Sequence, residues 1–188
     1  MEFLVDSILV TGCFSNLLIH QYGNYFCQKL FPRLTNEQKL KLWKELELDM
    51  PNYYKPALQQ VPSDVDVLMS KFLWIASNPK GTHSLQVFIE TLESPEFKVL
   101  ISALFERENP LYFAFNKHAT HVLIKYIELT TENPFLTEIY NVVTNNFCAL
   151  SMDSNGLPLV KKCLAWIRTP ALKANMIREL TENATLLA

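Results

Sequence analysis

The chain has 188 residues, of which 49% are hydrophobic and 19% are charged, with 17 basic and 19 acidic side chains. This composition excludes a disordered chain, and the near-neutral charge argues against binding nucleic acid by bulk charge alone, although a local recognition surface stays open. Only 4 glycines are present, which is too few for the Gly-rich loops that bind phosphate groups.

Four cysteines lie far apart in the sequence, at positions 13, 27, 148 and 163, and show no CxxC spacing. We expect them to be reduced and buried, in a cytoplasmic protein, with a nuclear or nucleolar location as the alternative. No apolar run approaches the roughly 18 residues that cross a bilayer, so we expect no membrane association.

Three of the glycines stand in one local setting, each before a polar pair and an amphipathic run. They are Gly23, Gly81 and Gly156, and Ala119 takes this place in a fourth copy. We call these four the anchor residues. Their spacings of 58, 38 and 37 residues predict a helical repeat array with one longer interval.

The apolar residues follow the anchor residues in register. Pairs stand seven and eight residues after each anchor, at Leu30-Phe31, Phe88-Ile89, Tyr126-Ile127 and Cys163-Leu164. Single apolar residues stand six before it, at Leu17, Ile75, Phe113 and Leu150. Helical spacing of this kind predicts core positions, with no cofactor needed to explain them.

Helix starts are marked by capping residues. Thr35 and Gln38 have capping-box spacing. Ser94-Pro95, Asn133-Pro134 and Thr169-Pro170 each place a good N-cap residue before a proline. Because β-branched alternation is sparse, we expect an all-α fold without a sheet.

The whole chain is predicted to be one repeat segment. Its units are about 1–34, 35–93, 94–131, 132–168 and a partial 169–188. The long interval places an insertion near 49–70, where prolines and polar residues indicate a loop.

The segment Tyr22-Gly23-Asn24-Tyr25-Phe26-Cys27-Gln28-Lys29-Leu30 resembles the second helix of a Pumilio (PUF) repeat, and Gly81 to Gln86 resembles it too. The resemblance covers most of the chain as about four units, with the third and fourth divergent. It implies a right-handed α-solenoid of roughly 36-residue, three-helix repeats. It also implies binding of single-stranded RNA, often in the 3′ untranslated regions of messenger RNAs, to control translation or decay.

The first unit offers a base-binding pattern. Asn24 and Gln28 are four residues apart, so on a helix they can present amides to one base edge, and Tyr25 beside them can stack. The family pattern of Asn, Tyr and Gln resembles a uracil reader, which implies a uridine-containing RNA.

The other units keep less of this pattern. Thr82, Gln86 and a stacking His83 are closer to adenine readers of the family. Thr120 and His121 keep the first two roles, but Ile124 cannot hydrogen-bond a base. In the fourth unit, Leu157 and Pro158 offer neither an edge acceptor nor a ring, and Lys161 could meet a phosphate.

We expect neither an enzyme nor a cofactor. No nucleophile elbow and no paired carboxylates with a base occur in the sequence. His118 and His121 have metal-like spacing, but no Cys or carboxylate supports them, so we expect no metal site.

Two functions stay open. One is a sequence-preferring RNA-binding module, and the other is a protein-interaction solenoid with an eroded RNA code. The missing amides and the lack of basic charge favour the protein-interaction solenoid. The complete pattern of the first unit favours the RNA-binding module. We also expect the C-terminal end to pair with a partner protein or a second copy, because repeats bury their core against neighbours.

Overall fold

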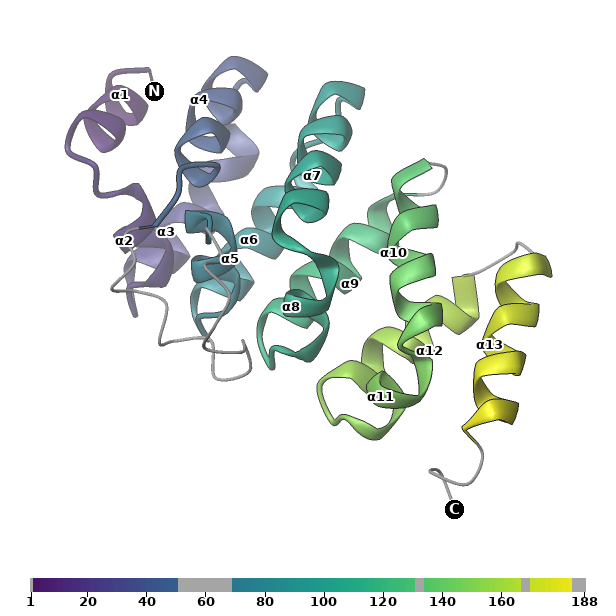
Figure 1. Ribbon diagram of the computed structural model, residues 1–188. Helices are drawn as coiled ribbons and strands as arrows, with labels where there is room; N and C mark the ends of the chain where they lie inside the picture. The colour runs from purple at the N-terminus through teal and green to yellow at the C-terminus, as the bar shows by residue number, and fades with distance from the viewer. Residues whose placement is uncertain (1, 51–68, 131–133, 167–169, 184–188) are drawn as a thin grey trace. The chain divides into compact units, whose positions relative to one another are not determined.

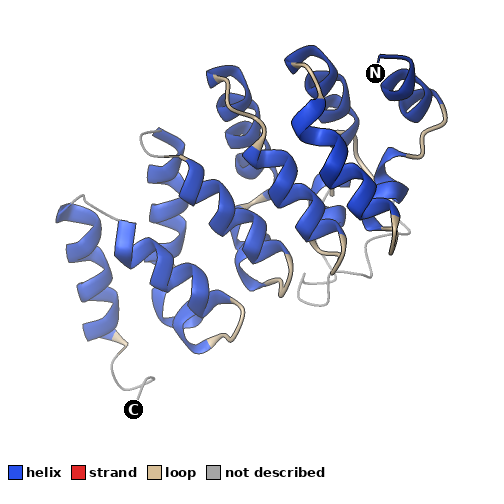
Figure 2. Cartoon of the chain, turned by 180° about the vertical axis from the view of Figure 1, so that it is seen from behind, coloured by secondary structure: helices blue, strands red, loops and turns tan. Residues whose placement is uncertain are grey.

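The fold is all helical in the part of the chain that the structure describes. The computed structural model describes residues 2–50, 69–130, 134–166 and 170–183 (Figure 1). Within these ranges no strand occurs, and one isolated antiparallel bridge joins Asp49 and Ser70 (Figure 2). The all-α prediction is therefore confirmed. None of the helices in these ranges is long and apolar enough to cross a membrane.

The chain divides into two compact units, Met1–Glu108 (unit 1) and Asn109–Ala188 (unit 2). The boundary lies at Asn109, inside the third of the predicted repeats, where this residue adopts a positive φ of 59°. Its side-chain oxygen accepts a hydrogen bond from the Leu111 N–H, which caps the helix that follows. Each unit is described by itself below.

Unit 1 consists of short helices in sequence order. They are α1 (Glu2–Val10), α2 (Phe14–Ile19), α3 (Gly23–Leu30), the 3-10 helix η1 (Phe31–Arg33), α4 (Asn36–Leu46), α5 (Lys71–Ala76), α6 (Gly81–Glu90) and α7 (Pro95–Glu108). The capping box that the sequence predicts is present. Thr35 Oγ1 accepts from the Gln38 N–H at 3.3 Å, and Gln38 Oε1 accepts from the Thr35 N–H at 3.1 Å.

The core of unit 1 contains two aromatic clusters. Phe31 lies 4.6 Å from Phe88 and 6.3 Å from Phe14, measured between ring centroids. Phe72 lies 5.6 Å from Trp43 and 6.0 Å from Phe105. All of these rings are almost fully buried. Phe31 and Phe88 are positions that the repeat register predicts as core.

Unit 2 repeats the same order of helices. They are α8 (Pro110–Phe115), α9 (Ala119–Leu129), α10 (Pro134–Asn145), α11 (Phe147–Met152), α12 (Gly156–Trp166) and α13 (Pro170–Glu182). Phe113, Tyr126, Ile127 and Cys163 are buried as the register predicts. Leu164 is 47% exposed, so its predicted burial is wrong. The physical reason is that α9 and α11 pack against other parts of α12, and Leu164 lies on the part that the described helices leave uncovered.

Each anchor residue is the first residue of a second helix, α3, α6, α9 or α12. The side chain three residues earlier caps that helix. His20 Nδ1, Asn78 Oδ1, Asn116 Oδ1 and Asp153 Oδ1 each accept from the anchor N–H at 2.8–3.1 Å. A side chain with an acceptor atom three residues before each anchor is therefore a second sequence signal for the start of these helices, in addition to the anchor residues themselves.

The glycine at three anchors has a steric cause. A Cβ on Gly81 would lie 2.2 Å from the Ile75 carbonyl oxygen, and a Cβ on Gly23 or Gly156 would lie 2.8 Å from the corresponding carbonyl of Leu17 or Leu150. The helix start therefore crosses the preceding helix too closely for a side chain.

The insertion is closed at its base. Residues 51–68 lie outside the described ranges, so the predicted loop itself is not described. At its ends the Met50 N–H donates to the Met69 carbonyl at 2.7 Å, and the Lys71 N–H donates to the Leu48 carbonyl at 2.8 Å. Lys71 also forms an ion pair with Glu45. The two ends are thus paired like the last residues of a hairpin.

A second set of contacts holds this base against α7. The buried Glu108 carboxylate accepts from the Ser70 N–H at 3.2 Å and from Arg107 at 2.9 Å. The Arg107 guanidinium also donates to the Glu47 carbonyl at 3.0 Å. Both ends of the insertion are therefore fixed by one pair of side chains.

Replacing residues 51–68 with a two-residue Asn-Gly turn should leave unit 1 folded, because Met50 and Met69 already pair at the spacing that such a turn connects. We expect cooperative unfolding with a midpoint within a few degrees of the parent, measured by circular dichroism. The same replacement combined with Glu108→Ala is the comparison, since it also removes the acceptor for the Ser70 N–H. Loss of cooperative unfolding in the first variant would show that the excised segment is structural.

The cysteines follow the sequence-based expectation with one exception. All four are free; Cys27, Cys148 and Cys163 are buried, and Cys13 is half-buried. Burial raises the pKa of the Cys27 thiol to about 12, with a smaller contribution from Cys13. Burial alone raises the pKa of Cys163 to about 12. These thiols are therefore protonated core residues without nucleophilic character.

Candidate nucleic-acid interface

The second helices of the first two repeats, α3 and α6, lie side by side in unit 1 (Figure 1). The Phe31–Phe88 ring contact joins their C-terminal ends. The Ser84 hydroxyl, buried on α6, donates to the Leu18 carbonyl of α2 at 3.2 Å. This packing fixes the residues at one, two and five positions after each anchor, which we call the base-contact positions.

In the first repeat the base-contact positions hold Asn24, Tyr25 and Gln28. The Asn24 amide nitrogen donates to the backbone carbonyls of His20 at 2.7 Å and Gln21 at 3.0 Å. Its oxygen accepts from Gln28 Nε2 at 3.1 Å. From their spacing we would expect both amides to be solvent-exposed, but Asn24 is only 2% exposed. The Asn24 side chain caps backbone carbonyls at the start of α3, and its oxygen orients the Gln28 amide.

The two other side chains of this repeat remain available. Tyr25 is 60% exposed, and Gln28 is half-buried. With Nε2 bonded to Asn24, the Gln28 oxygen is the part of this amide that can accept from a ligand. The first repeat therefore presents one acceptor and one aromatic ring next to each other.

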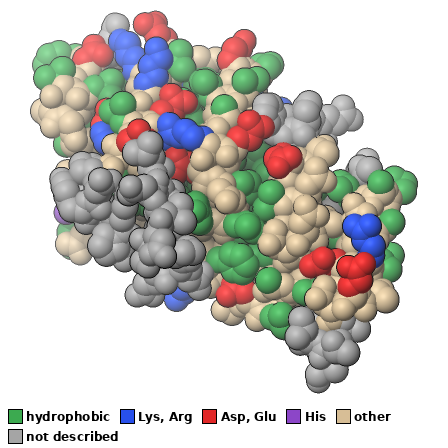
Figure 3. Space-filling model, viewed as in Figure 1, with side chains coloured by type: hydrophobic (Ala, Val, Ile, Leu, Met, Phe, Trp, Pro, Cys, Tyr) green, Lys and Arg blue, Asp and Glu red, His purple; other side chains and the backbone are tan. Residues whose placement is uncertain are grey.

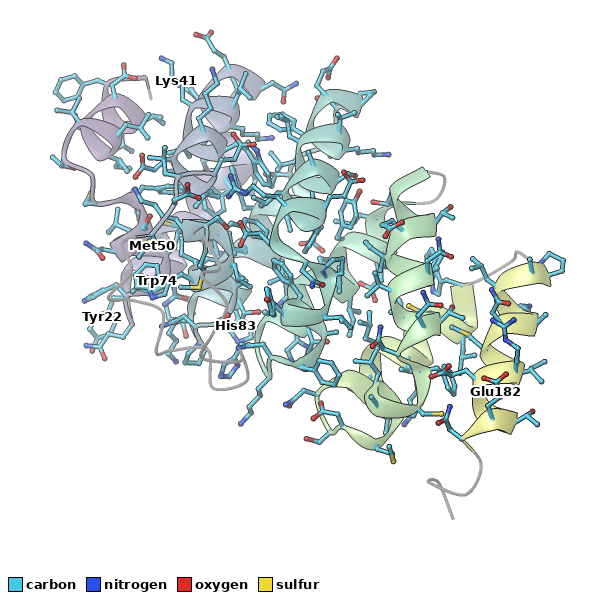
Figure 4. The ribbon with its side chains drawn as sticks, in the orientation of Figure 1. Tyr22, Lys41, Met50, Trp74, His83 and Glu182 are labelled. Carbon is cyan, nitrogen blue, oxygen red and sulfur yellow. The ribbon has the colours of Figure 1, made fainter. Side chains whose placement is uncertain are left out.

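The second repeat is arranged in the same way. Gln86 Nε2 donates to Thr82 Oγ1 at 3.2 Å and to the Thr82 carbonyl at 3.3 Å. Thr82 is buried and His83 is exposed. Figure 4 shows His83 and Tyr22 at the same lower margin of unit 1. The pairing of Gln28 with Asn24 is thus matched by that of Gln86 with Thr82.

The third repeat lacks this pairing. Ile124 stands at the fifth position and has no donor, and the buried Thr120 hydroxyl has no hydrogen-bond partner among the described residues. His121 is exposed. His118 and His121 belong to no group of three or more metal-ligating side chains in the described ranges.

The fourth repeat offers charge without an amide. Leu157 is half-buried, and Pro158 and Lys161 are exposed. Beside them Lys162 pairs with Glu128 of α9 at 2.7 Å and lies 5.0 Å from the centre of the Trp166 ring. The hydrogen bond from Lys162 holds the pKa of the Glu128 carboxyl below its ordinary value. Lys162 is thereby committed to linking α9 and α12, which leaves Lys161 as the accessible cation of this pair.

Charges of both signs mix on the face that carries α1, α4 and α7 of unit 1 (Figure 3). One such pair is Lys41 of α4 with Asp6 of α1, at 3.3 Å. A mixed surface of this kind gives little attraction for a polyanion. The aromatic and amide side chains described above are on α3 and α6, so the candidate interface is assigned to those helices.

These features define the chain as an α-helical repeat protein in which two second helices, α3 and α6, carry stacking and amide side chains at matched positions. The family model described as "Pumilio-family RNA binding repeat" matches residues 13–47 of this chain. Pumilio homolog 12 of Arabidopsis thaliana is 22% identical over 176 residues, which are 93% of this chain and 26% of that protein. Suppressor protein MPT5 of Saccharomyces cerevisiae is 24% identical over 139 residues, 63% of this chain and 16% of that protein.

Solved structures give the same answer for the fold. The RNA-binding domain of yeast Puf5p bound to SMX2 RNA superposes with a TM-score of 0.71 at 22% identity, covering 98% of this chain and 46% of that one. The Puf4 RNA-binding domain bound to a 3′ UTR recognition sequence gives 0.67 at 19% identity, with 95% and 52% covered. The chain has the α-solenoid fold of these Puf domains, and residues 13–47 match the Pumilio-family repeat. It spans about a quarter or less of the curated relatives and about half of the solved domains.

Proposed function

We propose that the chain binds single-stranded RNA through its second helices, with α3 and α6 as the main contact surface. The observation that carries the proposal is the pair of matched base-contact positions, in which a fixed amide lies beside an exposed ring. Rings of this kind stack on bases, and a neighbouring amide can bond a base edge. The Puf proteins to which the chain is similar are bound to RNA in their solved structures.

The first repeat suits uridine. Uracil presents an N3–H donor, and the Gln28 oxygen is the available acceptor once Nε2 is bonded to Asn24. Tyr25 stacks on the same base. In the second repeat, Gln86 and His83 take the corresponding roles, and we propose adenine as the base there. In unit 2, His121 stacks and Lys161 contacts a phosphate, without an edge contact at Ile124.

We further propose that the natural ligands are messenger RNAs, bound in their 3′ untranslated regions, and that binding controls their translation or decay in the cytoplasm. The support is the 3′ UTR recognition sequence held by the similar Puf4 domain. The second candidate is a protein-interaction solenoid. It is favoured by Ile124, which leaves the third repeat without an amide at the position of Gln28 and Gln86.

A gel-shift titration with a short uridine-containing RNA and its scrambled version, at two salt concentrations, separates the two candidates. RNA binding predicts a preference for the first RNA and an affinity that falls with salt. Equal, weak binding to both would favour the protein-interaction candidate.

Gln28→Ala should weaken binding to the uridine-containing RNA about five- to tenfold, the equivalent of about 1 kcal/mol for one lost hydrogen bond. Its unfolding midpoint should match the parent, because Gln28 is half-buried and its loss leaves the Asn24 donors bonded. Asn36→Ala, which removes an exposed amide from α4, is the control and should bind as the parent.

Asn24→Ala should behave differently, because it removes the donor to two backbone carbonyls. We expect it to lower stability by about 1–3 kcal/mol as well as to weaken binding. If Gln28→Ala binds uridine-containing RNA as tightly as the parent, Gln28 does not contact a base.

A further inference from the structure

Helix α3 and the residue before it carry exposed aromatic side chains beyond the base-contact positions. Tyr22 is 71% exposed and Phe26 is 45% exposed, and Lys29 is exposed as well. These residues stand at i, i+4 and i+7, so they form one stripe along the helix. Tyr25 lies between this stripe and Gln28 around the helix axis, because each residue advances by about 100°. We call Tyr22, Phe26 and Lys29 the flanking stripe.

The flanking stripe has a fixed start. The Tyr22 N–H donates to His20 Nδ1 at 3.3 Å, and the Tyr22 ring lies 5.9 Å from the His20 ring in an edge-on arrangement. The steric contact at Gly23 sets the direction of the helix immediately afterwards. Tyr22 is therefore an exposed ring on a well-positioned turn.

The other repeats do not expose this surface. The residue that corresponds to Phe26 is Ser84 in the second repeat and Leu159 in the fourth, and both are fully buried. Ser84 is bonded to the preceding helix pair through the Leu18 carbonyl. Among the described repeats, the first is therefore the one that carries an aromatic residue at this position.

The charge around the stripe favours a polyanion. From Tyr22 to Arg33 the sequence contains Lys29 and Arg33 and no acidic residue, in a chain whose net charge is −2. The Arg33 guanidinium donates to the Lys29 carbonyl, which keeps the two cations at one end of the helix. A surface made for another protein helix would not need two cations beside its rings, whereas a phosphate backbone does.

We propose that the flanking stripe is an additional nucleotide subsite, in which a base next to the one at Gln28 stacks on Phe26 and Tyr22 while Lys29 and Arg33 contact its phosphate. The proposal rests on RNA binding by the base-contact positions. Tyr25 would then separate two neighbouring bases, one held by Gln28 and the other by the stripe. The subsite has no edge amide, so it recognises a nucleotide without selecting the base.

The test compares two RNAs in a titration with the unaltered chain. One RNA is just long enough for the base-contact positions of α3 and α6, and the other carries two further nucleotides at either end. We expect the extension at one end to raise affinity about tenfold, as stacking of one base does, whatever base is added. The double variant Tyr22→Ala with Phe26→Ala should lose this gain and bind the shorter RNA as the parent does.

Phe3→Ala is the matched control, since it removes a phenyl ring that is 85% exposed on α1, outside the stripe. The control should keep the full gain from the longer RNA. Equal affinity of the parent for both RNAs, with the shorter one bound, would overturn the subsite and leave the proposed function intact. No binding of either RNA would overturn the proposed function.

Sedimentation of the parent and of the double variant tests whether the flanking stripe is instead a surface for self-association. We expect both to sediment with the same mass. A parent that self-associates and a double variant that does not would overturn the subsite, because the stripe would then be a protein interface.

Discussion

Gly81→Ala should lower the stability of unit 1 by about 3 kcal/mol, at the upper end of the cost of overpacking. A Cβ at this position would lie 2.2 Å from the Ile75 carbonyl oxygen and 2.7 Å from the Ile75 Cγ2. The first contact is with backbone, so it cannot be relieved by a side-chain rotation. The start of α6 would have to move away from α5, and His83 and Gln86 would move with it.

Urea unfolding followed by circular dichroism measures this effect. Gly12→Ala is the control, because nothing lies within 4 Å of its added Cβ and only its positive φ of 61° opposes the change. We expect a cost near 1 kcal/mol for a side chain in that backbone conformation. If Gly81→Ala costs no more than Gly12→Ala, the close approach of α6 to α5 does not require glycine.

Phe31→Ala should have a larger effect, about 3–5 kcal/mol, because it removes a fully buried ring and leaves a cavity. The ring contacts Phe14 and Phe88, at centroid distances of 6.3 and 4.6 Å, and thereby joins the first repeat to α6. We expect the variant to lose RNA binding together with stability, since the base-contact positions of α3 and α6 depend on this packing.

Phe31→Leu separates the two causes of that loss. Leucine keeps most of the buried volume, so stability should fall by less than about 2 kcal/mol and the variant should remain folded at the temperature of the assay. Its affinity for RNA should stay within about threefold of the parent. A folded Phe31→Leu variant without RNA binding would mean that Phe31 acts on the RNA site other than through packing.

Helix positions could be predicted from the sequence because their causes are local. The anchor residues begin α3, α6, α9 and α12, and the prolines at 95, 134 and 170 begin α7, α10 and α13. Glycine at a close helix crossing and proline in a first helical turn are requirements of the backbone itself, so they leave a visible period. The same period predicts the burial of Phe31, Phe88, Phe113 and Tyr126, and it does not predict the burial of Trp43, Phe97, Phe105 or Tyr140.

The details of the site were harder to predict because they depend on neighbours outside the local pattern. Spacing places Asn24 and Gln28 on one face, and does not show that backbone carbonyls of His20 and Gln21 bury Asn24. Phe26 and Ser84 occupy equivalent positions in two repeats, and only the packing of the preceding helix pair makes one exposed and the other buried. Exposure is a property of the array rather than of the motif.

The bridge between Asp49 and Ser70 has a consequence for how this array tolerates change. Because the two ends of the insertion are held at strand spacing, we expect the number of residues between them to have little effect on the helices on either side. A longer segment there would cost only the entropy of closing a larger loop, about 0.6 kcal/mol for each doubling of length. The interval of 58 residues beside intervals of 38 and 37 is therefore thermodynamically inexpensive. This point of the chain is where new sequence can accumulate without moving α3 relative to α6.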